Sequence, residues 1–241
     1  MEVVFSSFRI LHIVAGFVAL FLFWIPIVTK KGGRVHNSVG WSFVIAMALV
    51  AVSALFMGSY RIFFDSDADS ERISFSWFLI FISILSGTSS WYGLRVLRYK
   101  NRKNQHRNII DLFASCLLLA SGISISIYGI SIGSSLLTYF PILGLFLGII
   151  QLNYWLRKTT KKMHWYFEHF GGMFACSIST VTAFAVFGAP KLLQISSSNI
   201  FLWLAPTFVL VPILIGFKTY YERKFHKGNK NSKSENKIIQ S

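Results

Sequence analysis

Seven long apolar stretches restrict the fold of this chain more than any other feature of its sequence. Each is about 18 to 22 residues long, and a helix of about 20 apolar residues crosses a hydrocarbon core about 30 Å thick. The predicted spans are Ile10–Val28, Val39–Tyr60, Ser74–Leu94, Ile109–Ile130, Ser135–Leu156, Trp165–Gly188 and Ile200–Phe217. The sequence therefore predicts an all-α, polytopic integral membrane helix bundle with seven transmembrane helices.

The basic residues predict how these spans are oriented. Of the 24 Lys and Arg residues, all but four fall in alternate gaps and in the C-terminal tail, on one side of the spans. The four on the other side are Arg9, Arg61, Arg72 and Lys191. Because cytoplasmic loops carry an excess of Lys and Arg, we expect the N-terminus outside and the C-terminus in the cytoplasm. The expected location is the cell (cytoplasmic) membrane.

Composition and charge agree with this class. Hydrophobic residues make up 54% of the 241 residues, and seven spans with short loops leave no room for a soluble domain. We expect a seven-span membrane domain, residues 1–226, and a basic, disordered cytoplasmic tail, residues 227–241. The net charge of +15 is spread over the predicted cytoplasmic loops, where it suits anionic lipid head groups. The expected partner is therefore the lipid bilayer, with no nucleic acid, and the oligomeric state is left open.

Titratable side chains gather at the predicted cytoplasmic ends of the spans. Four of the six histidines lie there, together with the two acidic residues nearest to the membrane interior. These residues are His36, His106, His164, His169, Asp111 and Glu168. His164 and Glu168 share one helix face, whereas His169 points about 100° away from Glu168. Because ionisable groups inside a membrane are costly, these residues form the candidate functional site.

The leading hypothesis is a site for haem or a divalent metal in the cytoplasmic leaflet. Its cofactor-binding residues are His36, Asp111 and His169, and Glu168 and His106 are further candidate metal ligands. Imidazole binds zinc or haem iron, and carboxylates suit harder metals. Such a site would serve redox or metal-assisted chemistry, and no catalytic residue is assigned. Asp111 is expected to face the bundle with a hydrogen-bonding or cationic partner, within about 12 Å of His169.

A second hypothesis belongs to a different class of protein, a proton-linked small-solute transporter or a structural membrane accessory protein. Asp111 and His169 would then form a proton-linked or structural polar pair. Prolines interrupt the fifth and seventh predicted spans, as they do in broken transporter helices, and these are Pro141, Pro206 and Pro212. His12 is alone near the outer end of the first span, so a bis-histidine haem on that side has no partner.

Several short motifs resemble those of a known group of sequences. They are Leu11-His12-Ile13 with Gly16, Lys30-Lys31-Gly32-Gly33-x-x-His36 with Gly40 and Met47, Ile110-Asp111, and His169-x-x-x-Met173 leading to Thr182-Ala183-Phe184. Together they resemble an uncharacterised prokaryotic group of predicted multi-span membrane proteins, a domain of unknown function. The resemblance covers about Leu11 to Phe184 and implies the architecture and the residues that matter. It implies no activity.

Overall fold

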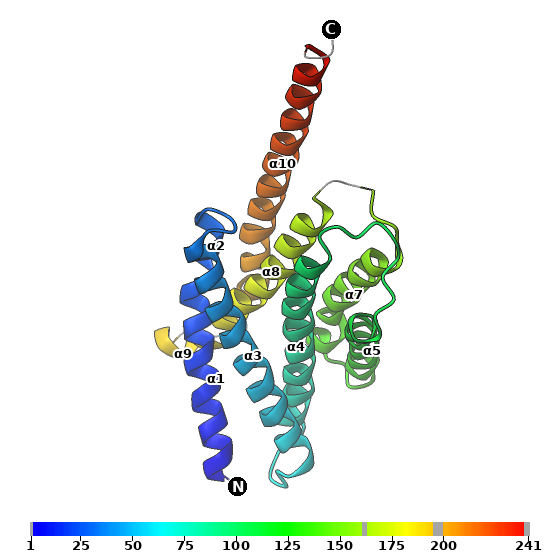
Figure 1. Ribbon diagram of the computed structural model, residues 1–241. Coiled ribbons are helices and arrows are strands. Elements are labelled where there is room, and N and C mark those ends of the chain that lie inside the picture. The colour runs from blue at the N-terminus through cyan, green and yellow to red at the C-terminus, as the bar shows by residue number, and fades with distance from the viewer. Residues whose placement is uncertain (1, 161–162, 195–199, 239–241) are drawn as a thin grey trace. The chain divides into compact units, whose positions relative to one another are not determined.

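The computed structural model consists of helices and the turns between them (Figure 1). It describes the backbone of residues 2–160, 163–194 and 200–238, and the side chains of residues 2–160, 163–194 and 205–224. No strand occurs in these residues. The elements are α1 (Glu2–Leu22), α2 (Trp24–Val28), α3 (Arg34–Phe63), α4 (Ser70–Arg95), the 3-10 turn η1 (Val96–Tyr99), α5 (Ile109–Ser131), α6 (Ser135–Tyr139), α7 (Pro141–Leu156), α8 (His164–Ala183), the π-helical turn η2 (Phe184–Gly188), α9 (Ala189–Leu193) and α10 (Ile200–Ile238).

Six helical segments within the described residues are long and apolar enough to cross a membrane. They are Glu2–Val28, Arg34–Phe63, Ser70–Tyr99, Ile109–Ser131, Ser135–Leu156 and His164–Leu193. The all-helical fold and the first six apolar helices are therefore confirmed. The seventh predicted span, Ile200–Phe217, lies within α10, and the side chains of its first residues are outside the described set. A count of seven spans stays a prediction.

The first helix begins earlier than the sequence pattern indicates. It starts at Glu2, well before Ile10, because Val3 and Val4 continue the apolar segment. His12 therefore lies nearly three turns inside the helix. Its expected place near the outer end of the membrane span stays a prediction.

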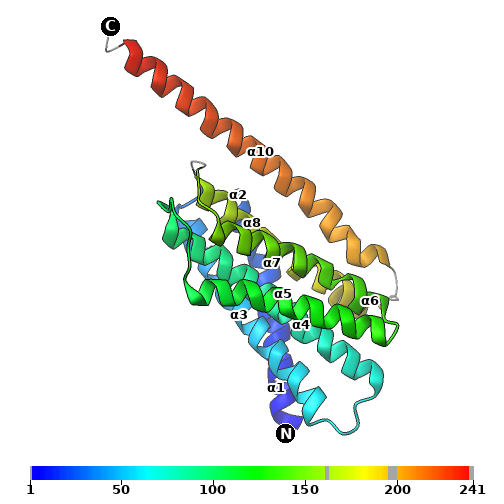
Figure 2. The ribbon, with the colours of Figure 1, turned by 90° about the vertical axis from the view of Figure 1, so that its right-hand side faces the viewer.

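Chain contacts divide the protein into two units, residues 1–181 and residues 182–241. In the first unit, α1 packs on α3, α3 packs on α4, and α4 also contacts α5 and α7. Figure 2 shows α5 and α7 side by side, as their contacts require. The α4 helix is thus at the centre of the unit, which is why it contains many of the buried polar residues.

Short turns fix where the helices of the first unit begin. Gly32 has a φ of 73°, a left-handed conformation that favours glycine, and the N–H of Gly33 bonds the carbonyl of Lys30. This turn lets α3 start at Arg34 and places His36 in its first turn. The side chain of Asn108 accepts a hydrogen bond from the N–H of Ile110 and so caps α5, which places Asp111 in that helix's first turn.

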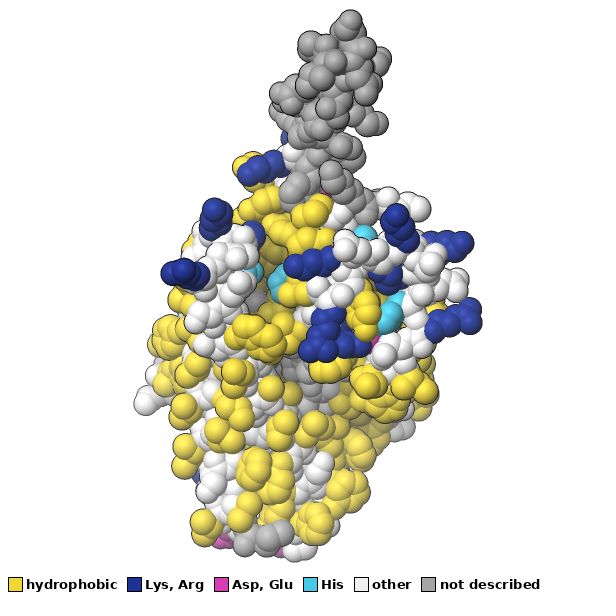
Figure 3. Space-filling model, in the orientation of Figure 1, with side chains coloured by type: hydrophobic (Ala, Val, Ile, Leu, Met, Phe, Trp, Pro, Cys, Tyr) yellow, Lys and Arg dark blue, Asp and Glu magenta, His cyan; other side chains and the backbone are white. Residues whose placement is uncertain are grey.

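The surface of the first unit is largely apolar. Val3 is 79% exposed and Ile109 is 81% exposed. In water, such exposure of large apolar side chains would be unfavourable. On the face shown in Figure 3, hydrophobic side chains cover the body and Lys and Arg side chains gather at one end. An apolar exterior with a charged end is what a lipid environment requires of a helix bundle.

The second unit contains the end of α8, η2, α9 and α10. Pro206 and Pro212 lie inside α10, which is continuous through both. The structure continues α10 to Ile238, into the segment expected to be a tail, and side chains beyond Lys224 are outside the described set. Disorder of residues 227–241 stays a prediction.

Candidate functional site

The histidines and acids singled out in the sequence lie at one end of the first unit, where α3, α5 and α8 begin and α4 and α7 end. Histidine side chains are visible at this end in Figure 3, beside the Lys and Arg side chains. Their contacts divide them into three sets, which are a pair of histidines, a network around Asp111, and two hydrogen bonds made by tyrosines.

His36 and His169 form the first set. Their ring centres are 6.4 Å apart, and the ring planes are inclined by 68°. His36 belongs to the first turn of α3 and His169 to the second turn of α8, so two segments far apart in the sequence supply the pair.

Both rings of the histidine pair are held by backbone carbonyls. Nδ1 of His36 lies 3.1 Å from the carbonyl oxygen of Pro26, and Nδ1 of His169 lies 2.7 Å from that of Gly93. A carbonyl oxygen only accepts hydrogen bonds, so each neutral ring carries its proton on Nδ1 and a lone pair on Nε2. Neither Nε2 atom makes a hydrogen bond to the part of the chain that the structure describes. This arrangement is typical of metal-ligating histidines.

Two lysines are charged neighbours of the histidine pair. Lys31 and Lys100 both act electrostatically on His169, and Lys31 also acts on His36. The ammonium group of Lys31 donates to the carbonyl oxygens of Pro26, at 2.7 Å, and Ile27, at 2.6 Å. Burial lowers the pKa of Lys31 from its ordinary value.

A close contact of two glycines sets the position of His169. A Cβ atom on Gly172 would lie 3.0 Å from the Cα and N atoms of Gly93 and 3.0 Å from the carbonyl oxygen of Ser89. Helices α4 and α8 therefore touch through their backbones at this point, as small residues permit. Since His169 is almost one turn before Gly172, its Nδ1 reaches the carbonyl of Gly93 directly.

Beside His36 there is open space on its own helix face. Gly40 is four residues after His36 and so lies on the same face, and a Cβ atom there would meet nothing within 4 Å. The space that a side chain at this position would enter is therefore not occupied by described atoms.

Asp111 is at the centre of the second set. It is 1% exposed, and Arg95 binds it through two hydrogen bonds of 2.7 Å, from Nε to Oδ1 and from Nη2 to Oδ2. His106 lies 2.8 Å from Oδ2 through its Nε2, and the indole N–H of Trp91 donates to Oδ1 at 3.2 Å. Asp111 thus faces the bundle with cationic and hydrogen-bonding partners, which confirms that expectation. A buried carboxylate requires such partners.

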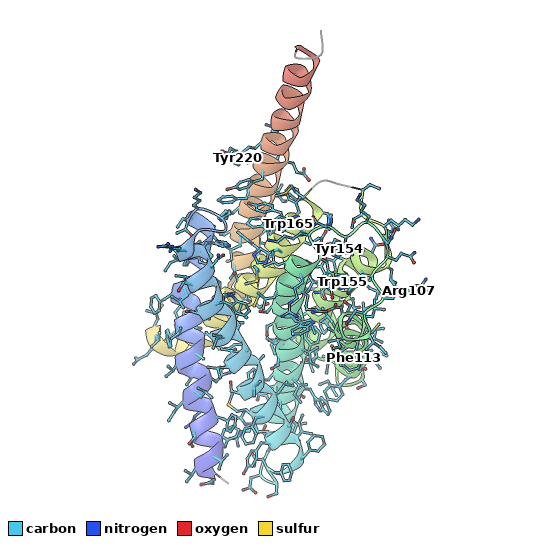
Figure 4. The ribbon with its side chains drawn as sticks, in the orientation of Figure 1. Arg107, Phe113, Tyr154, Trp155, Trp165 and Tyr220 are labelled. Carbon is cyan, nitrogen blue, oxygen red and sulfur yellow. The ribbon has the colours of Figure 1, made fainter. Side chains whose placement is uncertain are left out.

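The third set joins α4 and α7 to α8. The hydroxyl of Tyr92 donates to Glu168 at 2.5 Å, and the hydroxyl of Tyr154 lies 2.8 Å from Nδ1 of His164. The two tyrosine rings meet edge to face, with centres 5.8 Å apart. In Figure 4, Tyr154 and Trp155 lie on the side of α7 toward α4, in agreement with these contacts.

The candidate residues therefore come together in pairs and not in one group. Asp111 has His106 and Arg95 as its partners, His169 has His36, and Glu168 has Tyr92. Within the described residues, no group of three or more His, Cys, Asp or Glu side chains is arranged to hold a metal ion. The contacts lend no support to a shared site that includes both Asp111 and His169.

Sequence reasoning missed several members of these sets. Arg95 entered the sequence argument only as a cytoplasmic charge, yet it is the main partner of Asp111. Trp91 lies one helical turn before Arg95, so a search for polar residues at i and i+4 near the end of this span would have found both. No sequence signal pointed to Tyr92 as the partner of Glu168.

No protein-family model, characterised protein or solved structure matches this chain. The resemblance to the uncharacterised multi-span group stays a prediction.

Proposed function

We propose that this protein is a multi-pass membrane protein that binds one haem, and that His36 and His169 would hold it. The observation that carries the proposal is the pair itself, two imidazoles 6.4 Å apart whose Nδ1 atoms are both held by carbonyls. Such bonds fix the ring orientation and make Nε2 a better ligand.

The spacing of the rings fits one metal centre between them. A metal–imidazole bond is about 2.0 Å, and the ring centre lies about 1.1 Å behind the nitrogen, so a linear pair has centres about 6.2 Å apart. The distance in the protein is 6.4 Å. The separation of the two ring centres is therefore close to that of two imidazoles bound to one iron.

The composition of the site favours haem over a bare divalent ion. A structural zinc site uses four protein ligands, and this pair supplies two, whereas a porphyrin brings four nitrogens of its own. A bare dication would also be repelled by Lys31 and Lys100, which act on these rings. The propionate groups of a haem carry negative charge, so the same two lysines would attract them.

When bound between His36 and His169, haem would supply one-electron transfer. The residues of the chain would hold and orient it. His36 and His169 would fix its plane, Gly40 would leave room along α3, and the two lysines would pair with its carboxylates. The buried contact of Gly93 with Gly172 would keep the ligands at a constant separation.

The positive-inside rule supports the same topology as before, with the N-terminus outside and the tail in the cytoplasm. The haem would then lie in the cytoplasmic leaflet of the cell membrane. A proton-linked transporter that uses an Asp111 and His169 pair has less support, because Asp111 bonds Arg95 and His106.

The test is the haem content of protein purified in detergent. Wild type should show a Soret band with the spectrum of a six-coordinate, bis-histidine haem, and its intensity should correspond to one haem per chain. His36→Ala and His169→Ala should each lose the bis-histidine spectrum while still inserting into membranes, because one histidine contributes little to insertion.

His164→Ala is the matched control, since His164 lies at the same end but bonds Tyr154. It should keep the spectrum of wild type. A wild-type protein without haem, expressed with haem in excess and well folded, would refute the proposal. A spectrum that survives in both ligand variants would refute the assignment of the ligands.

A further inference from the structure

The network around Asp111 contains a histidine that is arranged as a base. Asp111 accepts four hydrogen bonds, two of them from Arg95, and one of the others comes from Nε2 of His106. Because a carboxylate accepts, the neutral ring of His106 carries its proton on Nε2 and a lone pair on Nδ1. A carboxylate that orients a histidine in this way is the arrangement of a general base. Nδ1 makes no hydrogen bond to the residues that the structure describes.

Aromatic side chains surround this histidine. The ring of Tyr99 lies 4.2 Å from the ring of His106, and that of Trp155 lies 4.7 Å from it, centre to centre. The backbone N–H of His106 donates to the carbonyl of Trp155 at 2.8 Å. The loop before α5 is thus fixed on α7, and the imidazole is held among planar rings.

One side of this network is open to lipid. Trp91 is 41% exposed, although its indole N–H bonds Asp111, and Ile110 and Phe113 on α5 are 55% and 65% exposed. On a membrane-spanning bundle, exposed apolar side chains at this depth face the bilayer. A molecule dissolved in the lipid can therefore approach the network laterally.

The chemistry of the network defines the ligand class. The lone pair on Nδ1 needs a donor, which a phosphodiester or carboxylate group does not have, and Arg95 is already occupied by Asp111. A lipid-soluble molecule with a hydroxyl group on a planar ring meets all the requirements. We propose that His106 and Asp111 bind the head group of a membrane quinol and that Nδ1 of His106 accepts a proton from its hydroxyl.

The proposed haem lies on the other side of the same helix. The carbonyl of Gly93 bonds His169, and the side chain of Arg95, two residues further along α4, bonds Asp111. Side chains two positions apart on a helix point about 200° away from each other, and a helix with its side chains is about 10–12 Å wide. The quinol would thus be separated from the haem by roughly the width of α4, and this part of the inference rests on the proposed function.

The reaction balances with haem iron as the oxidant. A quinol becomes a quinone by losing two electrons and two protons, and breaks its two O–H bonds. A haem bound as proposed would supply a one-electron acceptor, so the oxidation of one quinol would require two chains or two successive turnovers. One proton goes to Nδ1 of His106 and the other to water at the cytoplasmic surface.

Binding is tested first, without haem chemistry. Purified protein is dialysed, in the presence of dithionite to keep the ligand and any haem reduced, against a short-chain benzoquinol, and the bound quinol is measured after solvent extraction. Wild type should bind one equivalent saturably, and His106→Phe, which keeps a ring in place but lacks Nδ1, should bind at least about tenfold more weakly, the effect of one lost hydrogen bond of this kind.

Three controls separate the outcomes of this binding test. His164→Phe changes another histidine at the same end and should bind like wild type. His169→Ala lacks the proposed haem ligand and should also bind like wild type, so failure of the haem proposal leaves this test intact. His106→Gln, which can still accept a hydrogen bond, should bind more strongly than His106→Phe, a difference that a merely structural role would not produce.

Reduction by quinol is measured second, on protein that contains haem. The reduced short-chain quinol should reduce the haem of wild type, and His106→Phe should react about 100-fold more slowly, because a general base contributes at least that much. Dithionite should reduce both proteins equally. Non-saturable quinol binding by wild type, or equal quinol binding by wild type and His106→Phe, would overturn the proposal.

Discussion

Gly172 and Gly171 are neighbours in α8 and offer a matched test of the packing that positions His169. A Cβ atom at Gly172 would lie 3.0 Å from three backbone atoms of α4, whereas one at Gly171 would meet nothing within 4 Å. Backbone atoms cannot move aside as a side chain can, so Gly172→Ala must separate α4 from α8 by several tenths of an ångström. The separation would lengthen the bond of 2.7 Å from Nδ1 of His169 to the carbonyl of Gly93.

The expected cost follows from the contact. Overpacking a well-packed interior costs about 1–3 kcal/mol, and contact with three rigid backbone atoms of α4 places this site in the upper part, at about 2–3 kcal/mol. Replacing glycine by alanine in a helix contributes about 1 kcal/mol of stabilisation at either position. That contribution cancels in a comparison of the two variants. Gly172→Ala should therefore be about 2–3 kcal/mol less stable than Gly171→Ala.

The assay is unfolding in detergent, followed by circular dichroism, with wild type and both variants in the same micelles. Gly171→Ala should be as stable as wild type or slightly more stable. Where the proposed haem is bound, Gly172→Ala should also lose haem more readily, because one ligand loses its orientation. If the two variants unfold at the same midpoint, the close contact between α4 and α8 does not exist in the protein, and the reasoning on His169 fails with it.

Three further predictions concern the network around Asp111, the topology and the open space beside His36. Arg95→Leu leaves the buried carboxylate of Asp111 without its main cation and should cost about 3–5 kcal/mol in the unfolding assay. Adding Asp111→Asn should recover part of that loss. Additive effects of the two substitutions would contradict the pairing of Arg95 with Asp111. Reporter domains fused after Lys103 and at the C-terminus should both be found in the cytoplasm, and an external signal from either would refute the proposed topology. Gly40→Leu fills the open space beside His36 and should strongly lower the haem content of the protein, with the unfolding midpoint unchanged. Unchanged haem content would exclude haem from that face of α3.

The candidate site shows where sequence reasoning succeeds and where it stops. Asp111 was expected to face the bundle because lipid cannot solvate a carboxylate, and that expectation is confirmed by its bonds to Arg95 and His106. The grouping of Asp111 with His169 followed from their similar depth alone. The contacts place each with a different partner, because depth along a helix does not fix the direction in which a side chain points around it.

The outcome for the histidines has the same cause. His36 and His169 lie at a similar depth along the bundle. Their rings also come together, because of the turn at Gly32 and the glycine contact between α4 and α8. His164 shares that depth too, but its ring bonds Tyr154 on α7. Nothing in the spacing of these residues along the chain distinguishes the two cases.

The sequence by itself determined that this protein is a bundle of long apolar helices with its basic residues at alternate ends. Hydropathy and charge act locally, since each apolar segment must satisfy its own backbone hydrogen bonds within lipid whatever its neighbours are. Only the tertiary structure decided which histidine meets which partner. That choice depends on the rotation of each helix about its axis and on where small residues such as Gly93 and Gly172 let two backbones touch, and both are properties of helix pairs.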